Sequence, residues 1–201
     1  MNLEKNLQNS IDLYLNNFGI IFIATLVASI LSVISIGILT GPLFGGLMVL
    51  NLKILRDRPV VLNEIFAHFS KLLPTLILSL VSGICSFIAG KIPFIGPFVS
   101  IVWSPFILII TSFAIILVIE KEFTPIAAVK EGIAYFKTDP LVIWIYALIA
   151  SILSAIGLII FGIGVLLTIP FATICMSVAY HEYSDKGYFK VSGPDAHRPS
   201  V

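Results

Sequence analysis

The chain alternates between long apolar runs and short charged segments. Six runs are almost free of charge, and they cover residues 18–34, 36–55, 73–89, 98–119, 141–160 and 165–180. A helix that spans a bilayer needs about 20 mainly apolar residues, with a usable range of about 17–25. Since every backbone polar group in lipid needs a partner within the chain, such runs are expected to be helical. The pattern predicts an all-α protein, a polytopic transmembrane helical bundle with about six spans.

The connections between the apolar runs alternate in character. Those at 35–37, 90–97 and 161–164 are short and rich in glycine, which is typical of tight turns. The other two connections and both chain ends hold nearly all the charge. Six spans place these charged parts on one side, together with every one of the 12 Lys and Arg residues except Lys91. Because Lys and Arg concentrate on the cytoplasmic side, we expect both termini in the cytoplasm.

Each charged segment has the spacing of an amphipathic helix. In residues 3–14, 61–73 and 126–137, apolar positions recur every three or four residues with polar positions between them. Thr124 followed by Pro125 has the residue types of a helix cap and first turn. We therefore expect an interfacial helix at the cytoplasmic surface ahead of each pair of spans.

The order of interfacial helix, span, tight turn and second span occurs three times, at about 1–57, 58–122 and 123–185. The second span of each unit holds one proline: Pro42, Pro105 and Pro170. A proline inside a helix removes a hydrogen bond, so these three are candidate kinks or hinges. Because each unit begins and ends on the same side, we predict parallel repeats about an axis along the membrane normal. The alternative is a chance recurrence in apolar sequence.

Composition agrees with a membrane protein and narrows the remaining classes. The chain is 58% hydrophobic and 11% charged, with a mean hydropathy of +1.07, whereas soluble domains carry about 25% charged residues. A net charge of +1 gives no field that would attract nucleic acid. Cys85 and Cys175 both lie in apolar runs, so no disulfide framework is implied. We expect one transmembrane domain over 1–185 and a flexible cytoplasmic tail over 186–201.

Residues that could carry a reaction are few. No ionisable residue lies deep in a predicted span, where it would mark a transport path or an active site. His68, His181 and His197 lack the spacing of metal-binding or catalytic motifs. We therefore expect a protein that is not an enzyme and that has no catalytic residue, no metal and no cofactor.

Two small groups of residues are candidates for other roles. Gly41 and Gly45 have the spacing of small residues that lets helices approach closely, so they are candidate packing positions. Arg56, Arg58 and Lys71 form the one basic cluster of the sequence and are candidate headgroup contacts.

Short motifs in the first half of the chain add a resemblance. Gly41-Pro42, Gly45 and Arg56, followed by Glu64-Ile65-Phe66 and Phe69, resemble a family of uncharacterised bacterial six-span integral membrane proteins. That family is similar to the membrane domain fused to some glycerophosphoryl diester phosphodiesterases. A last span with a proline and an aromatic end, 170–180, also resembles it. The resemblance implies a helical membrane fold and little about mechanism, and the sequence has no phosphodiesterase catalytic domain.

The three units also resemble the two-span repeats of mitochondrial carriers in shape. In that family an acid and a base follow each kinking proline, whereas Pro42, Pro105 and Pro170 are followed by apolar residues. The likeness is therefore an analogy of shape alone.

Two functions fit the sequence. The leading hypothesis is a non-enzymatic accessory, scaffold or lipid-interacting protein of the bacterial envelope, located in the inner (plasma) membrane. Its expected partners are membrane lipids, with another membrane or cytoplasmic protein as an alternative. The rival is a small permease or carrier for an apolar or amphiphilic solute, in which the aligned prolines act as hinges. The sequence identifies neither a solute nor a protein partner.

Overall fold

The computed structural model describes residues 3–91, 96–159 and 163–187. Within these ranges the chain is all-helical, as predicted, and has no strand. Its helices are α1 (Leu3–Asn16), α2 (Phe18–Ile34), α3 (Thr40–Leu55), η1 (Leu62–Phe66), η2 (Phe69–Lys71), α4 (Leu72–Gly90), α5 (Gly96–Glu120), α6 (Pro125–Phe136), α7 (Pro140–Ile159) and α8 (Ile163–Asp185). Parts of the predicted turns at 90–97 and 161–164, and most of the predicted tail, lie outside the described residues.

The apolar runs form helices, with two clear shifts in a boundary. The helix α8 continues to Asp185, five residues beyond the predicted end of the sixth run. The second run was expected to begin at residue 36, but α3 begins at Thr40 because the chain first makes a turn. In this turn Ile36 and Gly37 have φ angles of 53° and 82°. A positive φ is strained for a β-branched residue. Backbone hydrogen bonds from Ile36 to Val33 and from Gly37 to Ser32 close this turn.

The charged segments form two different kinds of structure. The first is the helix α1, and the third is α6, whose cap is as predicted: Thr124 accepts a hydrogen bond from the Ala127 amide. The second segment was expected to be a three-turn amphipathic helix, and this expectation is wrong. It forms the short 3₁₀ helices η1 and η2, between which the backbone turns at His68. In this segment the backbone of Ile65 lies against Gly46 of α3.

Length and composition set how many helices are able to cross a membrane. Over the described residues, two stretches qualify: Leu62–Gly90 and Ile101–Glu120. The number rises to four if α1 with α2, and α6 with α7, each form one span bent by 87° and 107°. The helix α3 is apolar but has only 16 residues. Since side chains at 154–166 lie outside the described set, the six predicted spans stay a prediction.

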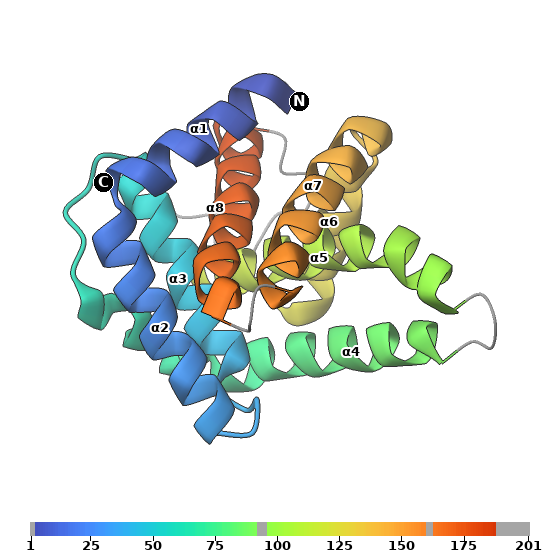
Figure 1. Ribbon diagram of the computed structural model, residues 1–201, viewed down its shortest axis with the longest axis horizontal. Coiled ribbons are helices and arrows are strands. Elements are labelled where there is room, and N and C mark those ends of the chain that lie inside the picture. The colour runs from blue at the N-terminus through green and yellow to red at the C-terminus, as the bar shows by residue number, and fades with distance from the viewer. Residues whose placement is uncertain (1–2, 92–95, 160–162, 188–201) are drawn as a thin grey trace.

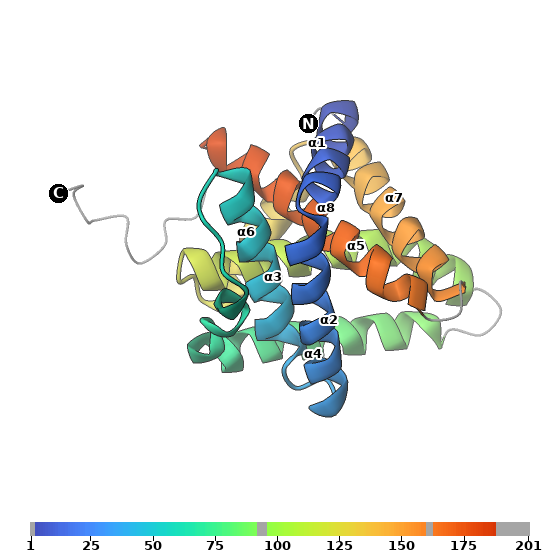
Figure 2. The same ribbon diagram turned by 60° about the vertical axis from the view of Figure 1, so that its left-hand side comes forward.

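The second helix of each hairpin lies at the centre of the molecule. The helices α3, α5 and α8 contact one another, and each also packs against its own hairpin partner, α2, α4 or α7. Each of these outer helices contacts a second central helix as well: α2 contacts α8, α4 contacts α3, and α7 contacts α5. Figures 1 and 2 show the three hairpins running in different directions from this centre, with α4 crossing the direction of α2 in both views.

The charged segments cover the central helices in the same rotating order. The helix α1 packs on α8, η1 packs on α3, and α6 packs on α5. The N-terminal half of α1 lies against the last turns of α8 (Figure 1). The central helices are therefore covered from two sides, by a neighbouring hairpin and by a charged segment.

The outer helices leave many apolar side chains uncovered. In the apolar window of α4, 17% of the residues are buried, against 56% in that of α5. Large apolar side chains are exposed on several helices and turns, among them Val33, Ile34, Ile36, Leu80, Phe87 and Leu141. Soluble monomers rarely expose apolar patches of this extent. This surface is compatible with contact to lipid.

Candidate functional site

Polar residues meet where the central helices end. Arg56, just after α3, forms an ion pair with Glu120 at the end of α5, and both side chains are largely buried. The hydroxyl of Tyr180, from α8, lies beside the same carboxylate. The three central helices thus share one polar contact, in which the charge of each partner is neutralised inside the molecule.

A second polar contact joins α6 to α8. Glu131 is fully buried, and Tyr183 donates a hydrogen bond to its carboxylate over 2.9 Å. Aromatic rings surround the pair: Tyr135 lies 4.9 Å from the Tyr183 ring and 4.1 Å from that of Phe113, between ring centroids. Tyr183 lies beyond the predicted sixth span; burial, the hydrogen bond to Glu131 and the charge of Glu131 all raise its pKa. The hydroxyl therefore stays protonated and remains a donor.

Hydroxyl and amide groups connect α3 to α8 deeper in the molecule. Asn51 donates to the Thr173 hydroxyl over 3.3 Å, and Ser177 donates to the Met48 carbonyl over 3.1 Å. Asn51 is fully buried, and its side-chain oxygen has no partner in the described part of the chain. These groups hold two helices together, which is the usual role of small polar residues inside membrane bundles.

The helix α1 attaches to the molecule through both polar and apolar side chains. The Asn6 amide donates to the Glu182 carboxylate, and the hydroxyls of Ser10 and Tyr146 lie 3.0 Å apart. On the other side of α1, Ile11 and Leu15 are 46% and 65% exposed. The amphipathic pattern predicts the helix correctly, and side chains of both kinds contact the protein: Leu3, Leu7 and Leu13 pack against the apolar cores beside the hydrogen bonds of Asn6 and Ser10.

The predicted headgroup contacts are only partly free. Arg56 pairs with Glu120, and Lys71 pairs with Glu122 at 2.8 Å, while Arg58 is exposed. A residue that sequence reasoning left aside, Lys53, pairs with Glu64 at 2.8 Å. Acids from other segments thus neutralise two of the three predicted cations, and a headgroup role for Arg58 stays a prediction.

The predicted packing glycines lie at contacts between helices. A Cβ on Gly41 would lie 2.6 Å from the backbone oxygen of Thr75 in α4, and one on Gly45 would lie 2.3 Å from Ile119 in α5. Gly46 makes a similarly close approach to Ile65, which the sequence did not single out. The three glycines together seat α3 against three different segments.

The three predicted hinge prolines occupy unequal positions. Pro105 and Pro170 lie inside α5 and α8. Pro42 lies in the first turn of α3, where the backbone amide has no partner within the helix. A kink is therefore not expected at Pro42, and a hinge role for the other two stays a prediction.

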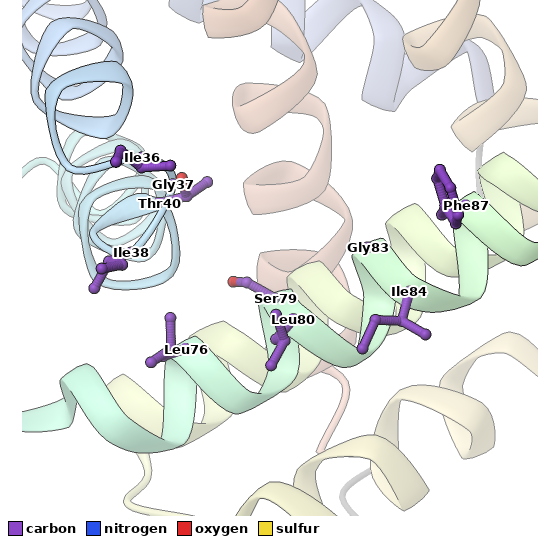
Figure 3. A pocket seen from close by; sticks show the side chains of 10 residues that line it. All are labelled: Ile36, Gly37, Ile38, Thr40, Leu76, Ser79, Leu80, Gly83, Ile84 and Phe87. Atoms are coloured by element: carbon purple, nitrogen blue, oxygen red, sulfur yellow. The ribbon is translucent and has the colours of Figure 1, made fainter.

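Two cavities of the structure have almost wholly apolar walls. One, of about 460 Å³, lies between the turn at 36–38 and α4. Figure 3 shows Ile36 and Ile38 on one side of it, and Leu80 and Phe87 on the other. The second, of about 420 Å³, lies between α4, α5 and α6. Both lie within the roughly 300–1,000 Å³ range of small-molecule sites.

Two further cavities near the ends of α1 and α8 have polar walls. One of about 310 Å³ is lined by Tyr135, Asp139 and Glu182, and one of about 540 Å³ by Lys5, His181 and Glu182 among others. In both, acids and bases face each other at short range; for example, Lys186 bonds Glu182 at 2.5 Å. Because the acids and bases in these cavities neutralise one another, their charges are not available to bind a polar ligand.

No group of His, Cys, Asp and Glu residues in the described ranges is arranged to hold a metal ion. Comparison with protein-family models, with curated proteins and with solved structures finds no match. The resemblance to the six-span bacterial family therefore stays a prediction.

Proposed function

We propose that this protein is a non-enzymatic, multi-pass protein of the bacterial inner membrane that interacts with lipid and acts as an accessory or scaffold. The observation that carries the proposal is a contrast between the interior of the protein and its outer surface. The polar groups at the centre pair with one another, as Arg56 does with Glu120 and Tyr183 with Glu131. The two apolar cavities are bordered by exposed apolar side chains.

The packing order supports three parallel repeats. Advancing every element by one unit converts the contact of α2 with α8 into that of α4 with α3, and then into that of α7 with α5. The same step converts the contact of α1 with α8 into that of η1 with α3 and of α6 with α5. A chance recurrence of apolar runs gives no reason for such an order. Six spans with both termini in the cytoplasm are part of this proposal.

Topology is tested with single cysteines in a chain whose Cys85 and Cys175 are replaced by alanine. We expect Lys91→Cys to react with a membrane-impermeant maleimide added to intact cells. Arg58→Cys is the matched position on the opposite side, and we expect it to react only after permeabilisation. Reaction of the Lys91→Cys variant from the cytoplasmic side alone would contradict the topology.

Function is tested with the purified protein in liposomes. We expect it to retain membrane lipid through detergent purification, and to leave the passage of a fluorescent fatty acid across the bilayer at the rate of empty liposomes. Accelerated passage by the protein alone would overturn the accessory role.

The rival proposal is a small carrier for an apolar or amphiphilic solute. The divergence of the three hairpins from one centre favours it, together with Pro105 and Pro170 inside two central helices. If Pro105→Ala and Pro170→Ala together leave any observed transport unchanged, the rival loses its structural basis. Pro42→Ala is the matched control, since that residue lies in a first turn.

A further inference from the structure

The apolar cavity between α4, α5 and α6 differs from the other apolar cavity in one respect. We call it the α4–α6 groove. Its walls include Ile77, Val81 and Cys85 of α4, Ile110 of α5, and Ile126 and Lys130 of α6. Among the residues that the structure describes, Lys130 is its one charged lining residue, whereas the cavity of Figure 3 has none. The groove therefore combines a long apolar wall with a single positive charge.

The charge of Lys130 is available for a ligand. Lys130 is exposed, and no ion pair holds it within the described residues. The adjacent acid, Glu131, is fully buried and accepts the Tyr183 hydrogen bond on the opposite face of α6. The nearest carboxylate in sequence thus does not neutralise Lys130.

The groove has a firm inner wall and an open outer edge. Gly132 seats α6 directly on α5, since a Cβ there would lie 3.1 Å from the Ile110 carbonyl oxygen. On the outer edge, Ile77, Val81 and Ile126 are 44%, 53% and 72% exposed. A chain that enters from the side would cover these three residues without moving α5 or α6.

We infer that the α4–α6 groove binds one acyl chain of an anionic phospholipid, with its headgroup phosphate paired to Lys130. An acyl chain matches the apolar wall, and a phosphate matches the single cation at the level of the interfacial helix. The inference rests on the proposed lipid-interacting function and names the site and the class of lipid.

The test is native mass spectrometry of the full chain, delipidated in mild detergent and titrated with phosphatidylglycerol or with phosphatidylcholine of the same chains. We expect one tightly bound phosphatidylglycerol and weaker phosphatidylcholine. Lys130→Gln should weaken phosphatidylglycerol binding roughly fivefold, the effect of one lysine near an anionic headgroup, and leave phosphatidylcholine unchanged. Lys137→Gln, at the exposed end of α6, is the matched control and should bind as the wild type does.

A second pair of variants tests the apolar wall. Val81→Trp fills the groove at an exposed position and should weaken both lipids, whereas Ile88→Trp, equally exposed on α4 but outside the groove, should weaken neither. The site is overturned if Lys130→Gln keeps the wild-type preference for phosphatidylglycerol, or if Val81→Trp binds lipid as Ile88→Trp does.

The outcomes separate this site from the proposed function. Lipid retained equally by all four variants would reject the groove and leave a lipid-interacting protein. If the protein accelerates the passage of fatty acid in liposomes and the four variants bind lipid as expected, the accessory role is rejected. The groove then remains a lipid-binding site.

Discussion

At the scale of single residues, the molecule neutralises charge internally where its helices converge. Glu131 has no exposure, and Arg56 and Glu120 are largely covered by protein. A buried charge is stable only while its partners remain, because removal of one partner leaves the other without either water or a hydrogen bond. These residues therefore hold the central helices together.

Removal of the Glu131 carboxylate should destabilise the protein. We expect Glu131→Ala to lower the free energy of unfolding by about 2–3 kcal/mol, because the buried Tyr183 hydroxyl loses a charged acceptor. Thermal unfolding in detergent measures the change. Lys137→Ala, exposed on the same helix, serves as the control and should unfold with the wild type. Equal stability of the Glu131→Ala and wild-type proteins would contradict a stabilising role for the hydrogen bond between Tyr183 and Glu131.

At the scale of elements, glycines decide how closely α3 approaches its neighbours. We expect Gly46→Ala to cost about 1–3 kcal/mol of stability, because the new Cβ would lie 2.6 Å from the backbone oxygen of Ile65 and rigid backbone has to shift. Gly83→Ala is the matched change in α4, where no atom lies within 4 Å of the new Cβ. It should be neutral or stabilising by up to about 1 kcal/mol, since alanine favours helix over glycine. Thermal unfolding of both variants in one detergent compares them, and similar losses would contradict the close approach.

The attachment of α1 should depend on pH. Burial raises the pKa of Glu182, but hydrogen bonds from Lys186 and Asn6 outweigh it, so the folded-state value is below the ordinary 4.5. A lowered carboxyl pKa adds stability that is complete above the unfolded-state pKa and is lost as the pH falls through the folded-state value. Amide hydrogen exchange in α1 should therefore quicken at acidic pH, after correction for the intrinsic rate.

Glu182→Gln provides the control for this pH effect. It removes the titrating group, so its α1 exchange should be nearly the same at neutral and acidic pH. A wild-type α1 that exchanges equally at both pH values would contradict the role of Glu182.

The sequence predicted elements better than it predicted contacts. The apolar run at 18–34 and the cap at Thr124 were correct, because helix length and capping depend on nearby residues. The burial of Glu131 and the contact of Ser10 with Tyr146 were missed. Both depend on tyrosines, Tyr183 and Tyr146, that are distant in sequence and carry no local signal. The close approach of Ile65 to Gly46, which joins two different elements, was missed as well.

At the scale of the whole molecule, the first and last helices are neighbours. The Asn6–Glu182 contact joins elements separated by nearly the whole chain and places the two ends of the described structure on one side. Chains with adjacent ends usually tolerate new termini in an exposed connection.

A circular permutant tests whether the two ends of the described structure are adjacent. A chain that begins at Pro59 and ends at Arg58, with Gly187 joined to Leu3 by a flexible linker, should reach the membrane and purify as a single species in detergent. Its unfolding temperature should be close to that of the wild type, since the cut lies in an exposed segment between α3 and η1. A matched permutant opened between Ile115 and Ile116, both buried in α5, should fail to accumulate. Failure of both permutants to accumulate would contradict the adjacency of the two ends.

The attachment of α1 to α8 also has a consequence for biosynthesis. Tyr146 and Glu182, which contact Ser10 and Asn6 of α1, are synthesised more than a hundred residues after that helix. Until then Asn6 and Ser10 lack these partners, so α1 cannot take its final place before α8 has been made. A chain truncated before α8 therefore leaves α1 without the side chains that hold it in place.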